Sequence, residues 1–122
     1  MHDQLVHPTP DDEHARIAAE TFHMLSDPTR VKILWALFEG ESNVSSLAEL
    51  VGASSTAVSQ HLSKLRLAGL VHSRREGTYA YYRATDAHVN RLLAEALSHA
   101  EHRTGTAPPP DPHGNSEAAG GG

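Results

Sequence analysis

Apolar residues recur along the chain with helical spacing in five stretches, and two shorter stretches around a glycine turn are strand-like. In the helical stretches, apolar side chains lie three and four positions apart, which places them on one face of a helix. The strand-like stretches flank Glu76-Gly77, a dipeptide typical of a tight hairpin turn. We predict helices over 10–25, 28–39, 46–51, 55–68 and 86–102, and strands over 70–75 and 79–83. The pattern therefore predicts a mainly α protein with one small β-hairpin.

Polar residues at the ends of these stretches support the helix boundaries. Thr9 and Asp27 each precede a proline, the combination of a capping side chain and a first-turn proline that begins helices. Ser46 with a glutamate three residues later fits a capping box at the start of the third helix. Gly52 then breaks that helix, so a short glycine-containing turn separates the third helix from the fourth.

The length and composition of the chain predict one small domain with flexible ends. A chain of 122 residues suits a single domain. We expect a flexible arm over 1–9, a folded domain over 10–103, and a disordered, Pro- and Gly-rich tail over 104–122. No apolar run approaches the ~18 residues that cross a bilayer, and the N-terminus lacks a signal-peptide pattern, so we expect a cytoplasmic protein without membrane contact. The absence of cysteine excludes disulfides and thiolate metal sites.

The charge of the chain is unevenly distributed. The formal net charge is -5 overall. Between residues 54 and 83, however, five lysines and arginines face one glutamate, so the local balance is 5 - 1 = +4. This basic centre is suited to the phosphate backbone of nucleic acid.

The third and fourth predicted helices form a helix-turn-helix, and the hairpin after them forms a basic wing. The outward positions of the fourth helix carry short hydroxyl side chains, an amide and a lysine, which suit base edges and phosphates. His61 lies beside them, and both phosphate contact and packing are open to it. The wing has two adjacent arginines directly before its turn. The predicted DNA-binding residues are Ser55, Thr56, Ser59, Gln60, His61, Lys64, Arg74 and Arg75.

The last predicted helix carries three histidines on one border of its apolar stripe. At 100° per residue, His99 lies about 20° from His88, and His102 lies about 40° to the other side. His88 and His99 are about 16 Å apart along the axis, which is too far for one metal ion. A second, antiparallel copy of the helix would unite the halves into two symmetric sites. The predicted ligands are Asp86, His88, His99 and His102, with His2, His7, Glu101 and His113 as further candidates.

With these elements in this order, residues 12 to 103 resemble the ArsR/SmtB family of winged-helix metal-responsive repressors. The matching segments are Leu25-Ser-Asp-Pro-Thr-Arg30, Val58-Ser-Gln-His-Leu62 with Lys64-Leu65, Gly69-Leu70-Val71, and Arg75-Glu-Gly77 with Tyr82. The spacing Asp86-x-His88 and His99-x-x-His102 looks like the inter-subunit site of the zinc-responsive and nickel/cobalt-responsive members. The resemblance implies a homodimer, joined through its first and last helices, that binds operator DNA without metal and is released by metal.

The sequence leaves the metal and two alternative functions open. Two histidine pairs with a carboxylate satisfy tetrahedral Zn²⁺, whereas Ni²⁺ or Co²⁺ needs about six ligands and therefore extra donors. A winged-helix regulator that responds to another signal, with structural histidines, is the first alternative. A metal-buffering protein is the second. An enzyme is not expected, because the chain has no His-Glu-x-x-His motif, nucleophile triad or phosphate-binding glycine loop.

Overall fold

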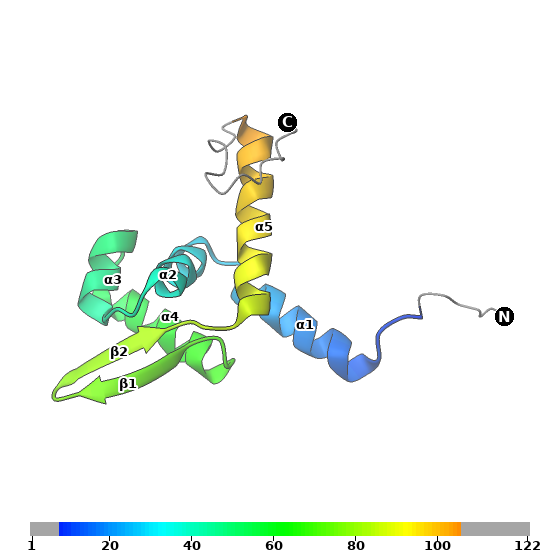
Figure 1. Cartoon of the computed structure of the whole chain (residues 1–122). Helices are drawn as coiled ribbons and strands as arrows, with labels where there is room; N and C mark the ends of the chain where they lie inside the picture. The colour runs from blue at the N-terminus through cyan, green and yellow to red at the C-terminus, as the bar shows by residue number, and fades with distance from the viewer. Residues whose placement is uncertain (1–7, 106–122) are drawn as a thin grey trace. The chain divides into compact units, whose positions relative to one another are not determined.

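The computed structural model describes residues 8–105 and confirms the predicted architecture of helices with one hairpin (Figure 1). The chain divides into two compact units, one ending at Ala87 and the other beginning at His88. No helix within residues 8–105 combines the length and the apolar character that a membrane span needs. The elements are α1 (Asp12–Met24), α2 (Pro28–Glu39), α3 (Val44–Val51), α4 (Ser55–Leu67), β1 (His72–Glu76), β2 (Tyr79–Arg83) and α5 (Ala87–Thr104).

The core of the first unit forms around α2, whose apolar residues occur on most sides of the helix. Ile33, Leu34 and Leu37 have at most 1% of their surface exposed. Leu47 of α3 and a stripe on α4 are equally buried, and α2, α3 and α4 lie together in Figure 1. The α4 stripe consists of Val58, Leu62 and Leu65. Its spacing of three and four residues turns one side of α4 inward and leaves the other side to solvent.

The turn between α3 and α4 depends on a left-handed residue and a cap. Gly52 has φ 72°, a conformation that costs a residue with a Cβ about 1 kcal/mol or more, and its N–H donates to the carbonyl of Ala48. Two residues later, the Ser54 hydroxyl accepts the N–H of Ala57 and caps α4. The helix-turn-helix predicted from the sequence therefore has a defined backbone at its turn.

The wing is an antiparallel pair of strands joined at Gly77. Arg74 pairs with Tyr81 and Arg75 with Ala80 in the register of β1 and β2. A third segment joins the base of the wing, because Ser42 and Tyr82 exchange two backbone hydrogen bonds of 3.0 and 2.8 Å. The wing is thereby attached to the connection between α2 and α3.

The α1 helix is amphipathic but buries none of its residues. Ile17 and Phe22 are 46% and 57% exposed, and α1 extends away from α2, α3 and α4 in Figure 1. An exposed apolar face on a helix of a small protein is typical of a surface that pairs with another chain.

The α5 helix has a narrower buried face than its apolar stripe predicts. Val89 and Leu93 are buried and Leu97 is half-buried, whereas Leu92 is 39% exposed. The first three residues follow one another at intervals of four, which is a single row along the helix. A neighbouring apolar row, which includes Leu92, remains accessible.

Several element boundaries differ from those predicted. The cap of α1 is Asp11, not Thr9, and it accepts the N–H of His14 at 2.8 Å. The cap of α3 is Asn43, which begins the helix before the Ser46 of the predicted capping box. Both differences have the same cause: a second capping side chain lies close by in the sequence, and Asp and Asn are among the strongest N-cap residues.

Candidate DNA-binding surface and metal-ligand helix

The recognition helix α4 presents five of its six predicted DNA-binding side chains to solvent. These five residues are Ser55, Thr56, Ser59, Gln60 and Lys64. Thr56, Gln60 and Lys64 lie on the side opposite the buried stripe of α4, and Ser55 and Ser59 lie nearer its border, so the core fixes which way they face. Their side chains are polar, mostly short, and uncharged except for the lysine, a composition suited to close approach to base edges.

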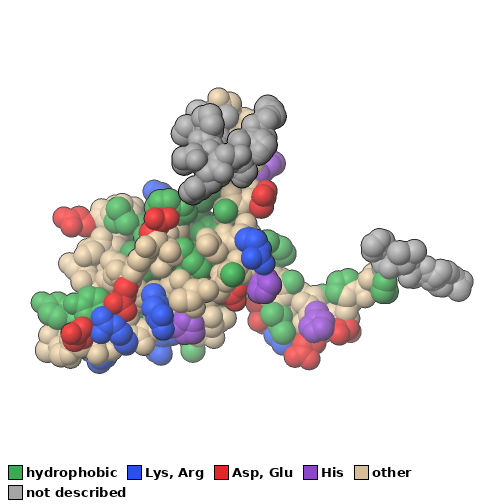
Figure 2. All heavy atoms as spheres, viewed as in Figure 1, with side chains coloured by type: hydrophobic (Ala, Val, Ile, Leu, Met, Phe, Trp, Pro, Cys, Tyr) green, Lys and Arg blue, Asp and Glu red, His purple; other side chains and the backbone are tan. Residues whose placement is uncertain are grey.

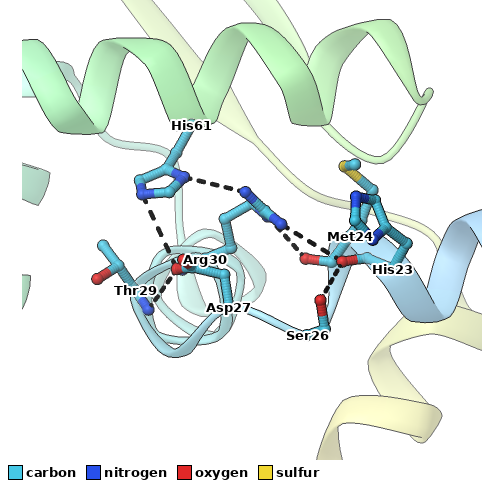
Figure 3. Close-up of polar contacts among 7 residues, drawn as sticks. All are labelled: His23, Met24, Ser26, Asp27, Thr29, Arg30 and His61. Carbon is cyan, nitrogen blue, oxygen red and sulfur yellow. Dashed lines mark hydrogen bonds and ion pairs between the residues drawn. The ribbon is translucent and has the colours of Figure 1, made fainter.

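His61 is the exception on this helix, because its side chain is only 19% exposed and contacts α2 (Figure 3). Its Nδ1 lies 3.3 Å from Nη1 of Arg30, and its Nε2 lies 3.8 Å from Oδ1 of Asp27. A guanidinium only donates hydrogen bonds, so Nδ1 accepts and the proton of the neutral ring resides on Nε2, facing the carboxylate. The imidazole therefore bridges a cation and an anion at the start of α2.

Arg30 extends the same network to the end of α1. This residue is 7% exposed, and its Nε and Nη2 donate to the carbonyls of Met24 and His23 at 2.9 and 3.3 Å (Figure 3). These carbonyls belong to the last turn of α1, where helical partners run out. The His23 carbonyl also accepts the N–H and the hydroxyl of Ser26 at 3.1 and 2.6 Å. One buried guanidinium thus connects the ends of α1 and α2 with the recognition helix.

Asp27 completes the network as the cap of α2. Its Oδ1 accepts the N–H groups of Thr29 and Arg30 at 2.8 and 3.0 Å. The hydrogen bond from the Arg30 N–H lowers the pKa of the Asp27 carboxyl, the His61 and Arg30 side chains lower it further, and partial burial opposes them. The carboxylate is therefore held ionised where it caps α2 and faces His61.

The two wing arginines have different surroundings. Arg74 donates from Nε and Nη2 to the two carboxylate oxygens of Glu41 at 2.8 and 2.9 Å, and from Nη1 to Glu76 at 2.9 Å. Its guanidinium carbon also lies 5.0 Å from the ring centre of Tyr81. The side chain of Arg75 is exposed, and within residues 8–105 it has no hydrogen bond or ion pair. In Figure 2, basic and acidic side chains lie next to one another over the hairpin.

The predicted metal ligands within the described residues are solvent-exposed. Asp86 immediately precedes α5, His88 lies in its first turn, and His99 and His102 lie in its last turns. Glu101, a further candidate ligand, is half-buried on another side. The remaining candidates, His2, His7 and His113, lie outside the described residues, as do most of the predicted N-terminal arm and tail.

The three histidines share one exposed row of α5. Intervals of four and three residues connect His88, Leu92, Glu95, His99 and His102, the spacing that faces a partner helix in paired helices. The first three of these residues and Arg91 line one surface hollow. Within residues 8–105, no three His, Asp or Glu side chains of the single chain come close enough to hold one metal ion.

The donor chemistry of this row fits a borderline divalent cation once two copies are combined. Neutral imidazole nitrogens with a carboxylate oxygen suit Zn²⁺, Ni²⁺ and Co²⁺. One local contact opposes binding at His88, whose Nδ1 lies 3.0 Å from Nη2 of Arg91 and accepts its hydrogen bond. Coordination through this Nδ1 requires Arg91 to move away, whereas coordination through Nε2 requires the other tautomer.

Sequence reasoning missed the Arg30 network and the pairing of Arg74 with Glu41. Arg30 is the arginine of the Leu25-to-Arg30 motif, at an inward position of a helix that is otherwise apolar on most sides, and that position is the signal for a buried cation with several partners. No comparable signal marks Glu41, which lies in a loop 33 residues before Arg74.

Comparisons with known proteins agree with this fold and assign the chain to a family. Residues 27–73 match the arsR family of bacterial regulatory proteins. The chain is 48% identical over 95 residues to the HTH-type transcriptional regulator KmtR of Mycobacterium tuberculosis, covering 78% of this chain and 72% of that protein. It is 40% identical over 82 residues to the cadmium resistance transcriptional regulatory protein CadC homolog of Staphylococcus aureus, covering 66% of this chain and 68% of the other.

A solved structure supports the same assignment. The homodimeric winged helix-turn-helix DNA-binding domain Mb0332 from Mycobacterium bovis has a TM-score of 0.64 and 35% identity, covering 79% of this chain and 95% of that one. The order of elements, the exposed face of α4 and these similarities lead to one conclusion. The chain belongs to the arsR family of transcriptional regulators, which bind DNA through a winged helix-turn-helix.

Proposed function

We propose that this regulator is a repressor that binds operator DNA as a metal-free homodimer and is released by Ni²⁺, Co²⁺ or Zn²⁺ bound between two α5 helices. The observation that carries the proposal is the exposed row of α5 on which His88, Leu92, Glu95, His99 and His102 follow one another at intervals of four and three. This row supplies both an apolar contact and imidazole donors to a partner helix that packs against it.

The residues of α5 have separate tasks in this proposal. The side chain of Leu92 provides an apolar surface on which an antiparallel copy of α5 packs. His99 and His102 of one copy then meet Asp86 and His88 of the other, and Glu95 accepts a hydrogen bond from an imidazole N–H. A bound divalent ion supplies a crosslink between the two helices. The exposed face of α1, with Ile17 and Phe22, supplies a second apolar surface for dimerisation.

Release from DNA follows from the geometry of a two-fold symmetric protein. Two α4 helices must be about 34 Å apart to enter successive major grooves on one side of a duplex. Joining the α5 helices fixes the two DNA-binding units at a spacing or stiffness that fits these half-sites poorly. Metal and DNA then weaken each other's binding by the same factor.

A titration of Zn²⁺, Co²⁺ and Ni²⁺ into the protein bound to DNA tests the proposal. The DNA is a duplex selected by the full-length protein from random sequences, and its release is followed by fluorescence anisotropy. We expect at least one metal to release it. Unchanged DNA affinity with all three metals would contradict metal sensing and leave DNA binding intact.

The His99→Ala variant separates a sensory histidine from a structural one. We expect it to bind the selected duplex normally and to lose the metal response. His14→Ala, an equally conservative change at an exposed histidine outside the row, serves as the control. Loss of both DNA binding and metal response in His99→Ala would show that the row has a structural role.

A regulator that responds to another signal is the second candidate, and the hydrogen bond from Arg91 to His88 favours it. In that case Arg91→Ala changes nothing in the metal titration. If His88 is a ligand, the same variant binds metal more tightly, because the lone pair of Nδ1 no longer has a competing donor. The Co²⁺ ligand-field spectrum also gives the coordination number: four favours Zn²⁺ and six favours Ni²⁺ or Co²⁺.

A further inference from the structure

Arg74 and Arg75 are neighbours on β1, but they occupy opposite faces of the wing. Successive side chains of a strand alternate between faces, and directly paired residues share one. Arg74 therefore lies on the face of Tyr81, whereas Arg75 lies on the face of Ala80. The sequence treats the two arginines as a single basic cluster, but the register separates them.

The guanidinium of Arg74 is occupied by carboxylates. Its three nitrogens all donate to Glu41 or Glu76, and the pair with Glu41 is the two-bond arrangement that matches a guanidinium to a carboxylate. The cluster of one arginine and two glutamates has a formal charge of 1 - 2 = -1, which repels phosphate. The hydrogen bonds to Glu41 and Glu76 also raise the pKa of the Arg74 guanidinium.

These bonds connect the wing to the segment between α2 and α3. Glu41 lies next to Ser42, the residue that exchanges backbone hydrogen bonds with Tyr82 of β2. Ser42 therefore fixes one strand of the wing, and Glu41 fixes the other through Arg74. Two attachments at one end restrict the angle of a hairpin more than one attachment does.

We propose that Arg74 is a positioning residue that sets the angle of the wing through Glu41, and that Arg75 is the wing residue that contacts DNA phosphate. The proposal rests on DNA binding by the winged helix and is independent of the metal. Arg75 is exposed and carries a charge that no carboxylate within residues 8–105 neutralises. Of the two adjacent arginines, therefore, only Arg75 offers phosphate a charge that is not already paired with carboxylates.

The salt dependence of DNA binding distinguishes the two roles. Each lysine or arginine on phosphate contributes about 0.9 to the slope of log affinity against log salt concentration. With the selected duplex, Arg75→Gln should reduce the slope by about 0.9. The double variant Glu41→Gln/Arg74→Gln removes one positive and one negative charge, and it should leave the slope unchanged. A slope reduced by the double variant, or unaffected by Arg75→Gln, would overturn the proposal.

The Glu41→Gln variant tests positioning directly, because charge and position predict opposite effects. Loss of an acidic residue strengthens DNA binding if only charge matters. If Glu41 sets the wing angle, affinity for the selected duplex should fall about fivefold while affinity for random-sequence DNA stays the same or rises. Glu39→Gln, the same charge change two residues away at the exposed end of α2, should affect both DNAs equally. The positioning role would be overturned if Glu41→Gln and Glu39→Gln both raised the affinity for the selected duplex and for random-sequence DNA by the same factor.

The failure of this proposal differs from failure of the proposed function. If the unmodified protein does not bind any duplex, both are wrong. If the unmodified protein binds DNA and responds to metal, but Arg75→Gln and Glu41→Gln/Arg74→Gln change the salt slope equally, only the assignment of Arg74 and Arg75 is wrong.

Discussion

Two arginine-centred networks, one around Arg30 and one around Arg74, hold the DNA-binding elements in place. Arg30 is 7% exposed and donates to two backbone carbonyls and to His61. The Arg74 side chain is 51% exposed and donates only to carboxylates. Both join segments about 30 residues apart: Arg30 reaches α4, and Arg74 reaches the segment before α3.

The difference in burial determines what each network contributes. A buried donor that is removed leaves its acceptors without partners and without water, whereas exposed carboxylates recover water when their partner is lost. The Arg30 network should therefore stabilise the fold, and the Arg74 network should orient the wing with little effect on stability.

The largest expected effect is that of Arg30→Met, which keeps an apolar stem but removes every side-chain donor. The Met24 carbonyl and Nδ1 of His61 lose this donor, whereas the His23 carbonyl keeps its hydrogen bonds from Ser26. We expect the free energy of unfolding in urea to fall by about 3 kcal/mol. Arg16→Met, at an exposed arginine that pairs with Glu20 on α1, is the control and should have little effect. Equal stabilities for the two variants would contradict the comparison.

A smaller effect is expected at His61, where the substituting side chain can keep or remove the bridge. Leu fills similar space but bonds neither Arg30 nor Asp27, and we expect a cost of about 1 kcal/mol in urea unfolding. Gln offers an acceptor and a donor, as the neutral imidazole does, and should recover most of that loss. The bridge would have no energetic role if Gln and Leu were equally destabilising.

Asp27→Asn tests the charge of the network while keeping the cap, because Asn also accepts hydrogen bonds at this position. The pKa of Asp27 is below its ordinary value of 3.8, so the stability it contributes is complete above about pH 4 and is lost as pH falls through the lower folded value. The difference in free energy of unfolding between the wild type and the variant should be below about 1 kcal/mol for this partly exposed group, and it should become smaller in acid. A gap that is constant from neutral to acidic pH would exclude the charge as its cause.

The elements of the fold were predictable because each one depends on nearby residues. The helical spacing of apolar residues predicted α2 and α4, and Gly52 predicted the turn between α3 and α4. The exposed face of α4 followed from the same periodicity, which sets the inward stripe and thus the outward one. His61 was harder: its position borders the two faces, and only the packing of α2 beside α4 brings Arg30 within reach.

The roles of the two wing arginines could not be predicted, because they depend on register and on a distant loop. A shift of one residue in the pairing of β1 and β2 would exchange the faces of Arg74 and Arg75. Glu41 is joined to Arg74 by folding and not by any local pattern. The proposed metal site was predictable only in part for a similar reason. The spacing of His88, His99 and His102 predicts ligands, but no three ligands within residues 8–105 of one chain come together, so the proposal needs a second chain.

The smallest expected effect on stability is that of Glu41→Gln, and it is the sharpest test of the comparison. The hydrogen bond from Arg74 lowers the pKa of the Glu41 carboxyl below its ordinary value of 4.5, so any stability from this pair is present above that pH and is lost as pH falls. Because the pair is exposed, salt screens it, and urea midpoints of the variant and the wild type should coincide at about 0.15 M salt. A loss of stability comparable to that of Arg30→Met would mean that exposure does not separate the two networks. Coincident midpoints together with weakened binding to the selected duplex would instead show that Glu41 acts on the orientation of the wing and not on the fold.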